Sequence, residues 1–82
     1  YSSGFLKRTG KLPNKVQSKL AARLELLATN PFNPLLHTKP LAGDFSGFYS
    51  FRITRDWRVI FKFLSAEAVQ LVDVGNRKDI YR

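Results

Sequence analysis

The sequence predicts an α+β domain in which N-terminal helices pack on one face of an antiparallel, mostly meander β-sheet. Two observations support this prediction. Apolar residues recur at helical spacing in the first half of the chain and at every second position in much of the second half. The 82 residues suffice for one domain, and no internal repeat or linker divides them, so residues 1–82 are expected to form a single domain.

Two helices are expected before residue 31. Ser2 and Ser3 can cap a short helix over residues 5–11, because serine oxygens accept hydrogen bonds from the free N–H groups at a helix start. A longer helix is expected over residues 14–29, where apolar residues follow at spacings of four, four and three and share one face: Val16, Leu20, Leu24 and Leu27. Pro31 ends this helix, because proline disfavours the helical conformation in the residue before it.

The rest of the chain predicts a long connection followed by three strands. Residues 31–47 contain three prolines and two glycines and indicate the connection. Residues 49–54 and 57–63 alternate between apolar and polar positions and predict two strands joined by a tight turn around Arg55 and Asp56. Residues 68–74 are more continuously apolar, which predicts a third strand in the interior of the sheet.

The composition favours a polyanionic partner, RNA above all. Fourteen Lys and Arg against six Asp and Glu give a net charge of +8, which raises the encounter rate with polyanions. Without cysteine the chain has no disulfide framework or thiolate site, and the single His37 cannot assemble a metal cluster. No window reaches the roughly 18 consecutive apolar residues of a membrane span. We therefore expect a cytoplasmic protein with no metal, no small-molecule cofactor and no membrane partner.

The alternation of the first two strands also assigns their charged residues to a face. Arg52 and Arg58 stand between apolar residues and are expected on the face opposite the helices, as an exposed cationic surface that Lys62 continues. Guanidinium groups suit bidentate contact with phosphates. A merely solvated outer face is the alternative. On the other face, Trp57, Phe61 and Phe63 are expected in the core rather than on a base-stacking platform.

The last residues add further cations and a tyrosine. Arg77, Lys78 and Arg82 follow the third strand, together with Tyr81. A tyrosine can stack on a base or handle a proton, although an ordinary phenol has a pKa of about 10 and needs cationic neighbours for that role. The alternative is a rim tyrosine that anchors the tail. His37 is interpreted as an exposed loop histidine.

Three segments resemble the RelE/ParE superfamily of bacterial toxins from type II toxin–antitoxin systems. They are KPLAGDFSGFYSFRITRDWRVIFKF, then VDVGNRKDIYR after an apolar strand, and upstream SSGFLKRTGKLPNKVQSKLAARLELLATNPF. The most specific features are the leucine and glycine in the turn before the first meander strand, the arginine in DWRVIF, and the glycine-x-arginine ending in tyrosine. The resemblance covers nearly the whole chain.

The resemblance implies a microbial RNase-like fold with a helical hairpin on a four-stranded sheet, whose first strand is expected to be truncated here. It also implies a ribosome-dependent mRNA endonuclease, an mRNA interferase, in which the ribose 2′-hydroxyl attacks the adjacent phosphate without metal. The implied partners are the ribosome, mRNA and a cognate antitoxin. A ParE-like inhibitor of DNA gyrase, or an inactive RNA-binding relative, is the alternative.

Matching positions assign roles to individual residues. The resemblance places Arg52, Arg58, Arg77, Tyr81 and Lys39 in the catalytic set. It leaves four further cations for RNA binding: Arg55, Lys62, Lys78 and Arg82. Two positions depart from the family pattern, because many relatives have a histidine where this chain has Asn76, and one branch has a glutamate base where it has Lys39. The proton acceptor is therefore open, with Lys39 and Tyr81 as candidates.

Overall fold

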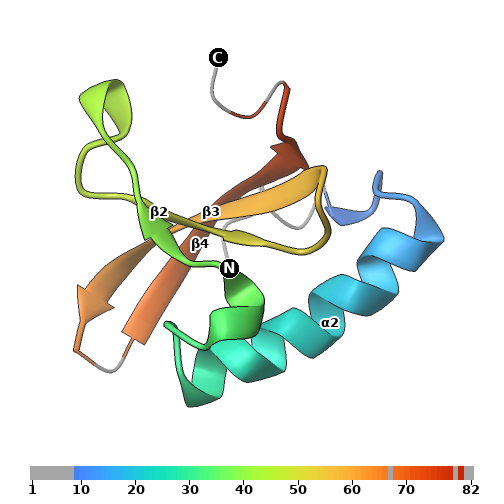
Figure 1. Ribbon diagram of the computed structural model, residues 1–82, viewed down its shortest axis with the longest axis horizontal. Helices are drawn as coiled ribbons and strands as arrows, with labels where there is room; N and C mark the ends of the chain where they lie inside the picture. Colours follow the sequence, from blue (N-terminus) through green and yellow to red (C-terminus); the bar gives the residue numbers. More distant parts are fainter. Residues whose placement is uncertain (1–8, 67, 79, 81–82) are drawn as a thin grey trace.

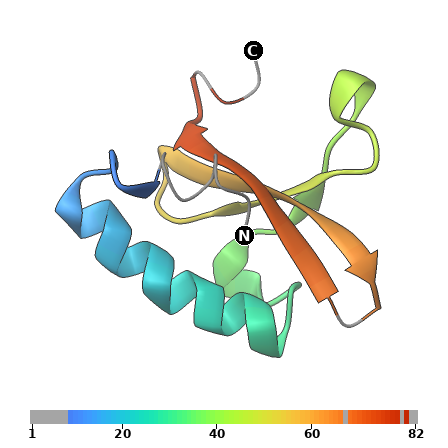
Figure 2. The ribbon, with the colours of Figure 1, turned by 180° about the vertical axis from the view of Figure 1, so that it is seen from behind.

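The computed structural model describes residues 9–66, 68–78 and 80, which form one helix packed against one sheet (Figures 1 and 2). The helix α2 (Asn14–Thr29) precedes four strands: β1 (Lys39–Pro40), β2 (Tyr49–Arg52), β3 (Trp57–Ser65) and β4 (Ala68–Asn76). Two short 3-10 helices, η1 (Pro34–Leu36) and η2 (Gly43–Phe45), flank β1. All pairings are antiparallel, in the order β1-β2-β3-β4. The predicted α+β class and meander are confirmed.

Helix α2 has the bounds that the apolar spacing predicts. Val16, Leu20 and Leu27 are buried on the face that meets the sheet. The helix ends where Asn30 becomes extended and its N–H donates to the carbonyl oxygen of Leu26 at 2.8 Å, directly before Pro31. The predicted first helix, residues 5–11, lies largely outside the described residues.

The core lies between α2 and the inner face of the sheet. Phe51 and Phe61 are fully buried there, and their ring centroids are 6.0 Å apart. Tyr49 and Phe63 extend this aromatic cluster with centroids 5.8 and 5.5 Å from that of Phe61. Trp57 packs against the same core. The three aromatic residues of β3 are therefore core residues, as predicted.

Two predictions about the sheet are wrong. The connection after α2 contains the unpredicted strand β1, whose two residues include a proline and are too few to show alternation. Residues 68–74 belong to β4, which the described pairings place at the end of the sheet, whereas β3 is interior. The apolar run arises instead from a bulge. Between the pairs Ile60–Asp73 and Phe61–Leu71, Val72 is the extra residue, so Leu71 and Val74 both face the core.

Gly47 sets the entry into β2. Its φ of +91° is a conformation that side-chain-bearing residues rarely adopt. We expect Gly47→Ala to lower the free energy of unfolding by about 1–2 kcal/mol. Gly75→Ala is the control, because Gly75 has no positive φ and its added methyl carbon would meet Ile80 at an ordinary 3.7 Å. Urea unfolding compares the two variants, and equal losses would contradict the backbone argument.

Candidate functional site

The outer face of the sheet, opposite α2, carries two arginines directly across from each other. The β2–β3 register pairs Arg52 with Arg58, and the β3–β4 register pairs Arg58 with Gly75. Residues paired in this way point to the same face of a sheet, and the core residues Phe51 and Val59 occupy the other face. The predicted face of both arginines is therefore correct.

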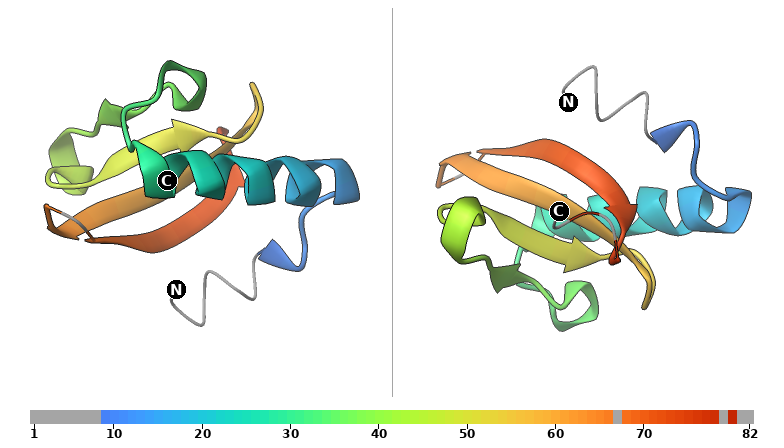
Figure 3. Two further views of the ribbon diagram at one scale, coloured as in Figure 1. Left: turned by 90° about the horizontal axis from the view of Figure 1, so that it is seen from below. Right: turned by 90° about the horizontal axis from the view of Figure 1, so that it is seen from above.

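The predicted exposure of Arg58 is wrong. Only 8% of its surface is accessible, whereas Arg52 is half-buried. The segment after β4 turns onto the same side of the sheet, the side opposite α2 (Figure 3). Ile80 from this segment is itself buried and lies over Gly75, the cross-strand neighbour of Arg58. The sequence alternation could not show that a tail covers this face.

The two arginine side chains are incompletely hydrogen-bonded among the described residues. The Nε atoms of Arg52 and Arg58 are both buried, and neither has a hydrogen-bond partner in the described part of the protein. Like charges directly opposite in a sheet destabilise it, and a buried N–H without an acceptor adds the cost of its lost hydration. An anion that accepted hydrogen bonds from both side chains would reduce the repulsion between the two charges and would also give the buried N–H groups an acceptor. We define Arg52 and Arg58 as the arginine pair.

Two lysines of the predicted site lie on the same face at different distances from the arginine pair. Lys39 is exposed on β1 and pairs with Ser50, two residues before Arg52, which makes it a diagonal neighbour of the pair. Lys62 pairs with Gln70 farther along β3. The side chains of Ser50 and Ile60, both 1% exposed, separate Lys62 from the pair. Lys39 therefore belongs to the site more directly than Lys62 does.

Arg77 is held at the turn between β2 and β3. Its backbone N–H donates to the carbonyl oxygen of Asp56 at 2.7 Å, and its Nε lies 3.5 Å from Oδ1 of Asp56. The N–H of Lys78 donates to the side-chain oxygen of Asn76 at 3.0 Å, and the Lys78 side chain is exposed. These contacts bring the start of the tail beside the strand ends that carry the arginine pair. Tyr81 and Arg82 lie outside the described residues.

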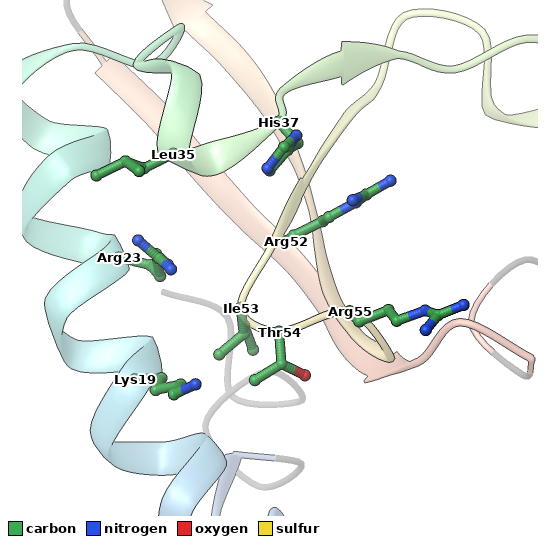
Figure 4. Close-up of a pocket in the computed structure, with 8 residues that line it drawn as sticks. All are labelled: Lys19, Arg23, Leu35, His37, Arg52, Ile53, Thr54 and Arg55. Atoms are coloured by element: carbon green, nitrogen blue, oxygen red, sulfur yellow. The ribbon is translucent and has the colours of Figure 1, made fainter.

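A basic cavity of about 430 Å³ opens between α2, η1 and the segment after β2 (Figure 4). The described residues that line it include four cations and no acid: Lys19, Arg23, Leu35, His37, Arg52, Ile53, Thr54 and Arg55. Arg52 thus lines this basic cavity and also belongs to the arginine pair. Sequence reasoning missed Lys19 and Arg23 as site residues, although their spacing of four places them on one side of α2.

The described residues offer neither a metal-binding cluster nor a membrane-spanning helix. No group of three His, Asp or Glu side chains among them is placed to hold a metal ion. Within the same residues, no helix has both the length and the apolar content needed to cross a membrane.

Comparison with known proteins gives a family match over almost the whole chain. The family model described as ParE toxin of type II toxin-antitoxin system, parDE, matches residues 2–81. No curated protein matches the sequence.

Solved structures share the fold at low sequence identity. YafQ from E. coli strain BL21(DE3) is 24% identical with a TM-score of 0.79, and the match covers 100% of this chain and 94% of YafQ. A RelB-RelE antitoxin-toxin complex from Methanococcus jannaschii gives 20% identity and a TM-score of 0.78, covering 98% and 92%. A YoeB/ParE toxin from Agrobacterium tumefaciens is 19% identical with a TM-score of 0.76, and the match covers 93% of each chain.

Proposed function

Since this chain belongs to the ParE toxin family of type II toxin–antitoxin systems, we propose that it acts as a metal-independent endoribonuclease that cuts mRNA on the ribosome. The observation that carries the proposal is the arginine pair, two opposed arginines whose buried Nε atoms have no hydrogen-bond partner among the described residues. Such groups suit a phosphate, because a guanidinium presents several N–H donors in a fixed plane.

The proposed reaction is attack by a ribose 2′-oxygen on the adjacent phosphorus. The new O2′–P bond forms as the P–O5′ bond breaks, which leaves a 2′,3′-cyclic phosphate and a free 5′-hydroxyl. The phosphate gains negative charge as it becomes pentacoordinate, and fixed cations stabilise that charge most. Arg58 and Arg52 would contact the phosphate oxygens, and Arg77, held beside them by Asp56, would supply a third guanidinium.

The reaction also needs groups that move protons. One group must take the proton of the 2′-hydroxyl, and another must protonate the leaving 5′-oxygen. Lys39, a diagonal neighbour of Arg52 on the outer face, and Tyr81 are our candidates. We expect Lys39→Ala and Tyr81→Phe each to slow cleavage on programmed ribosomes by about 100-fold, the lower end of what a positioned acid or base contributes. If both variants kept near-wild-type rates, both assignments would be wrong.

A cognate antitoxin is the proposed protein partner. Two structures of similar fold are toxin–antitoxin complexes, RelB-RelE from Methanococcus jannaschii and DinJ-YafQ from E. coli. The net charge of +8 favours an acidic or amphipathic antitoxin segment that folds on binding.

Inhibition of DNA gyrase is the second candidate function, because the matching family carries the ParE description. The absence of both usual bases favours this candidate further. Lys39 stands where one branch of the resembled toxins has glutamate, and Asn76 stands where many of them have histidine. The purified protein should be added to a translation assay and to a DNA-supercoiling assay in parallel. The ribonuclease proposal predicts that only translation stops, and that mapped mRNA 5′ ends after induction fall within codons in the reading frame. Loss of supercoiling with intact mRNA would favour the gyrase role.

The arginine pair should also bind a simple oxyanion in the free protein. We expect inorganic phosphate at ten times its dissociation constant to raise the free energy of unfolding by about 1.4 kcal/mol, because it binds the folded state only. Thermal unfolding in phosphate and in chloride of equal ionic strength measures the effect. Arg58→Met should lose most of it, and an equal gain in the variant would contradict a specific site.

A further inference from the structure

We infer that the basic cavity binds a second backbone phosphate of the same RNA strand, through Lys19 and Arg23 of α2. This inference rests on the proposed ribonuclease function and extends it from the cleaved phosphate to a neighbouring one. Neither residue belongs to the outer face of the sheet, so the inferred contact is separate from the arginine pair.

The side chains of the four cations that line the basic cavity point in two directions. Lys19 and Arg23 leave α2 on the side that faces Ile53 and Thr54, whereas the guanidinium groups of Arg52 and Arg55 extend away from α2 (Figure 4). The segment after β2 therefore has cations on both of its sides. A polyanion that crosses this segment would meet positive charge on the outer face first and in the basic cavity next.

The charge around the basic cavity is positive. Lys19 and Arg23 are four residues apart on one helix, where like charges destabilise each other. No acidic residue is among the described residues that line the cavity. The basic cavity therefore concentrates positive charge without internal compensation, which favours an external anion.

The basic cavity is continuous with the arginine pair, which favours RNA over an acidic protein segment. Arg52 belongs both to the arginine pair and to the cavity lining, so the two sites adjoin at the end of β2. A nucleic acid strand repeats the same phosphate at every nucleotide, so a strand held at the pair can present another phosphate to the adjoining site. Thr54 and His37 add a hydroxyl and an imidazole as further donors.

The test compares two double variants that remove the same charge. The cavity variant, Lys19→Gln with Arg23→Gln, removes both cations that α2 contributes to the basic cavity. Lys11→Gln with Lys15→Gln removes two exposed cations that do not line the cavity and serves as the matched control. The probe is a fluorescent single-stranded 2′-O-methyl RNA dodecamer, which lacks the attacking hydroxyl and cannot be cut. Anisotropy gives the dissociation constant at several NaCl concentrations.

The cavity variant should bind about tenfold more weakly at low salt. Its slope of log K against log salt should be shallower by about 0.7 for each phosphate that the variant no longer neutralises, the value for single strands. The control variant should keep the wild-type slope. Circular dichroism verifies folding, and Lys19→Arg with Arg23→Lys should restore the slope because it restores both charges.

Two outcomes would overturn the inference. Equal slope changes in both double variants would mean that only net charge matters. Unchanged RNA binding in the cavity variant would show that the cavity holds no second phosphate. If the same variant then bound a fluorescent acidic peptide more weakly than the wild type does, the cavity would be assigned to a protein partner. Wild-type cleavage of unmodified mRNA on ribosomes is measured separately. If the wild type cuts mRNA and the cavity variant keeps the wild-type slope of log K against log salt, only the second phosphate site is refuted. If the wild type neither cuts nor binds RNA, the proposed function itself is refuted.

Discussion

Replacing Arg58 with methionine is expected to slow RNA cleavage strongly and at the same time to stabilise the fold. Arg58 is 8% exposed, faces Arg52 across the strand pair, and has a buried Nε without a hydrogen-bond partner in the described part of the chain. Replacing buried ion pairs with apolar side chains of similar volume is often neutral or stabilising by about 1–4 kcal/mol, and a buried charge that has no ion-pair partner gives up even less when it is replaced. Loss of one group that stabilises transition-state charge slows reactions by about 10²–10³-fold.

Two measurements on the same protein test this expectation. The midpoint of guanidinium chloride unfolding should rise in Arg58→Met, and mRNA cleavage on ribosomes should fall by at least about 100-fold. Lys15→Met is the control, because Lys15 is an exposed cation on α2 away from the site, and it should change neither property. A folded, fully active Arg58→Met protein would contradict the proposed role, and a destabilised one would show that Arg58 supports the fold.

The arginine pair should also show coupling in a double-mutant cycle. If the two guanidinium groups repel each other, Arg52→Met and Arg58→Met should each remove the repulsion. The stability gain of the double variant should then be smaller than the sum of the single gains. Such coupling between close residues is commonly about 0.5–3 kcal/mol in size, a range that chemical unfolding resolves.

Truncation of Phe61 to alanine is expected to remove a large share of the stability of the fold. Phe61 is fully buried, lies on the interior strand β3, and its ring meets those of Tyr49, Phe51 and Phe63 at 5.5–6.0 Å. A buried Phe→Ala change costs about 3–5 kcal/mol. At about 0.05–0.15 kcal/mol per residue, a chain of this size has only about 4–12 kcal/mol of stability.

The effect of Phe61→Ala should appear as a clearly lowered urea midpoint, followed by near-ultraviolet circular dichroism. Leu64→Ala is the matched control on the same strand, because Leu64 is 62% exposed and its truncation removes little buried surface. Phe61→Leu should fall between the two, since it leaves a smaller cavity. A wild-type midpoint for Phe61→Ala would contradict the placement of the core.

The elements with strong periodicity could be predicted from the sequence, and the weaker ones could not. Helix α2 and strands β2 and β3 follow from apolar spacing, because every residue on their buried faces contributes to the pattern. Strand β1 was not predicted, because a strand of two residues is too short to show an alternation of apolar and polar positions. The position of β4 was predicted wrongly, because the bulge at Val72 turns an alternating strand into an apolar run that is typical of an interior strand.

The candidate site also combines features that follow from the sequence with features that only the tertiary structure shows. The sequence by itself determined which face of the sheet carries Arg52 and Arg58, because side-chain alternation in a strand is a local property. Only the tertiary structure decided that Arg58 is buried, that Arg77 is held by Asp56, and that Lys19 and Arg23 share a cavity with Arg52. Each of these features depends on contacts between residues far apart in the chain, and a local pattern records faces but not the segments that come to cover them.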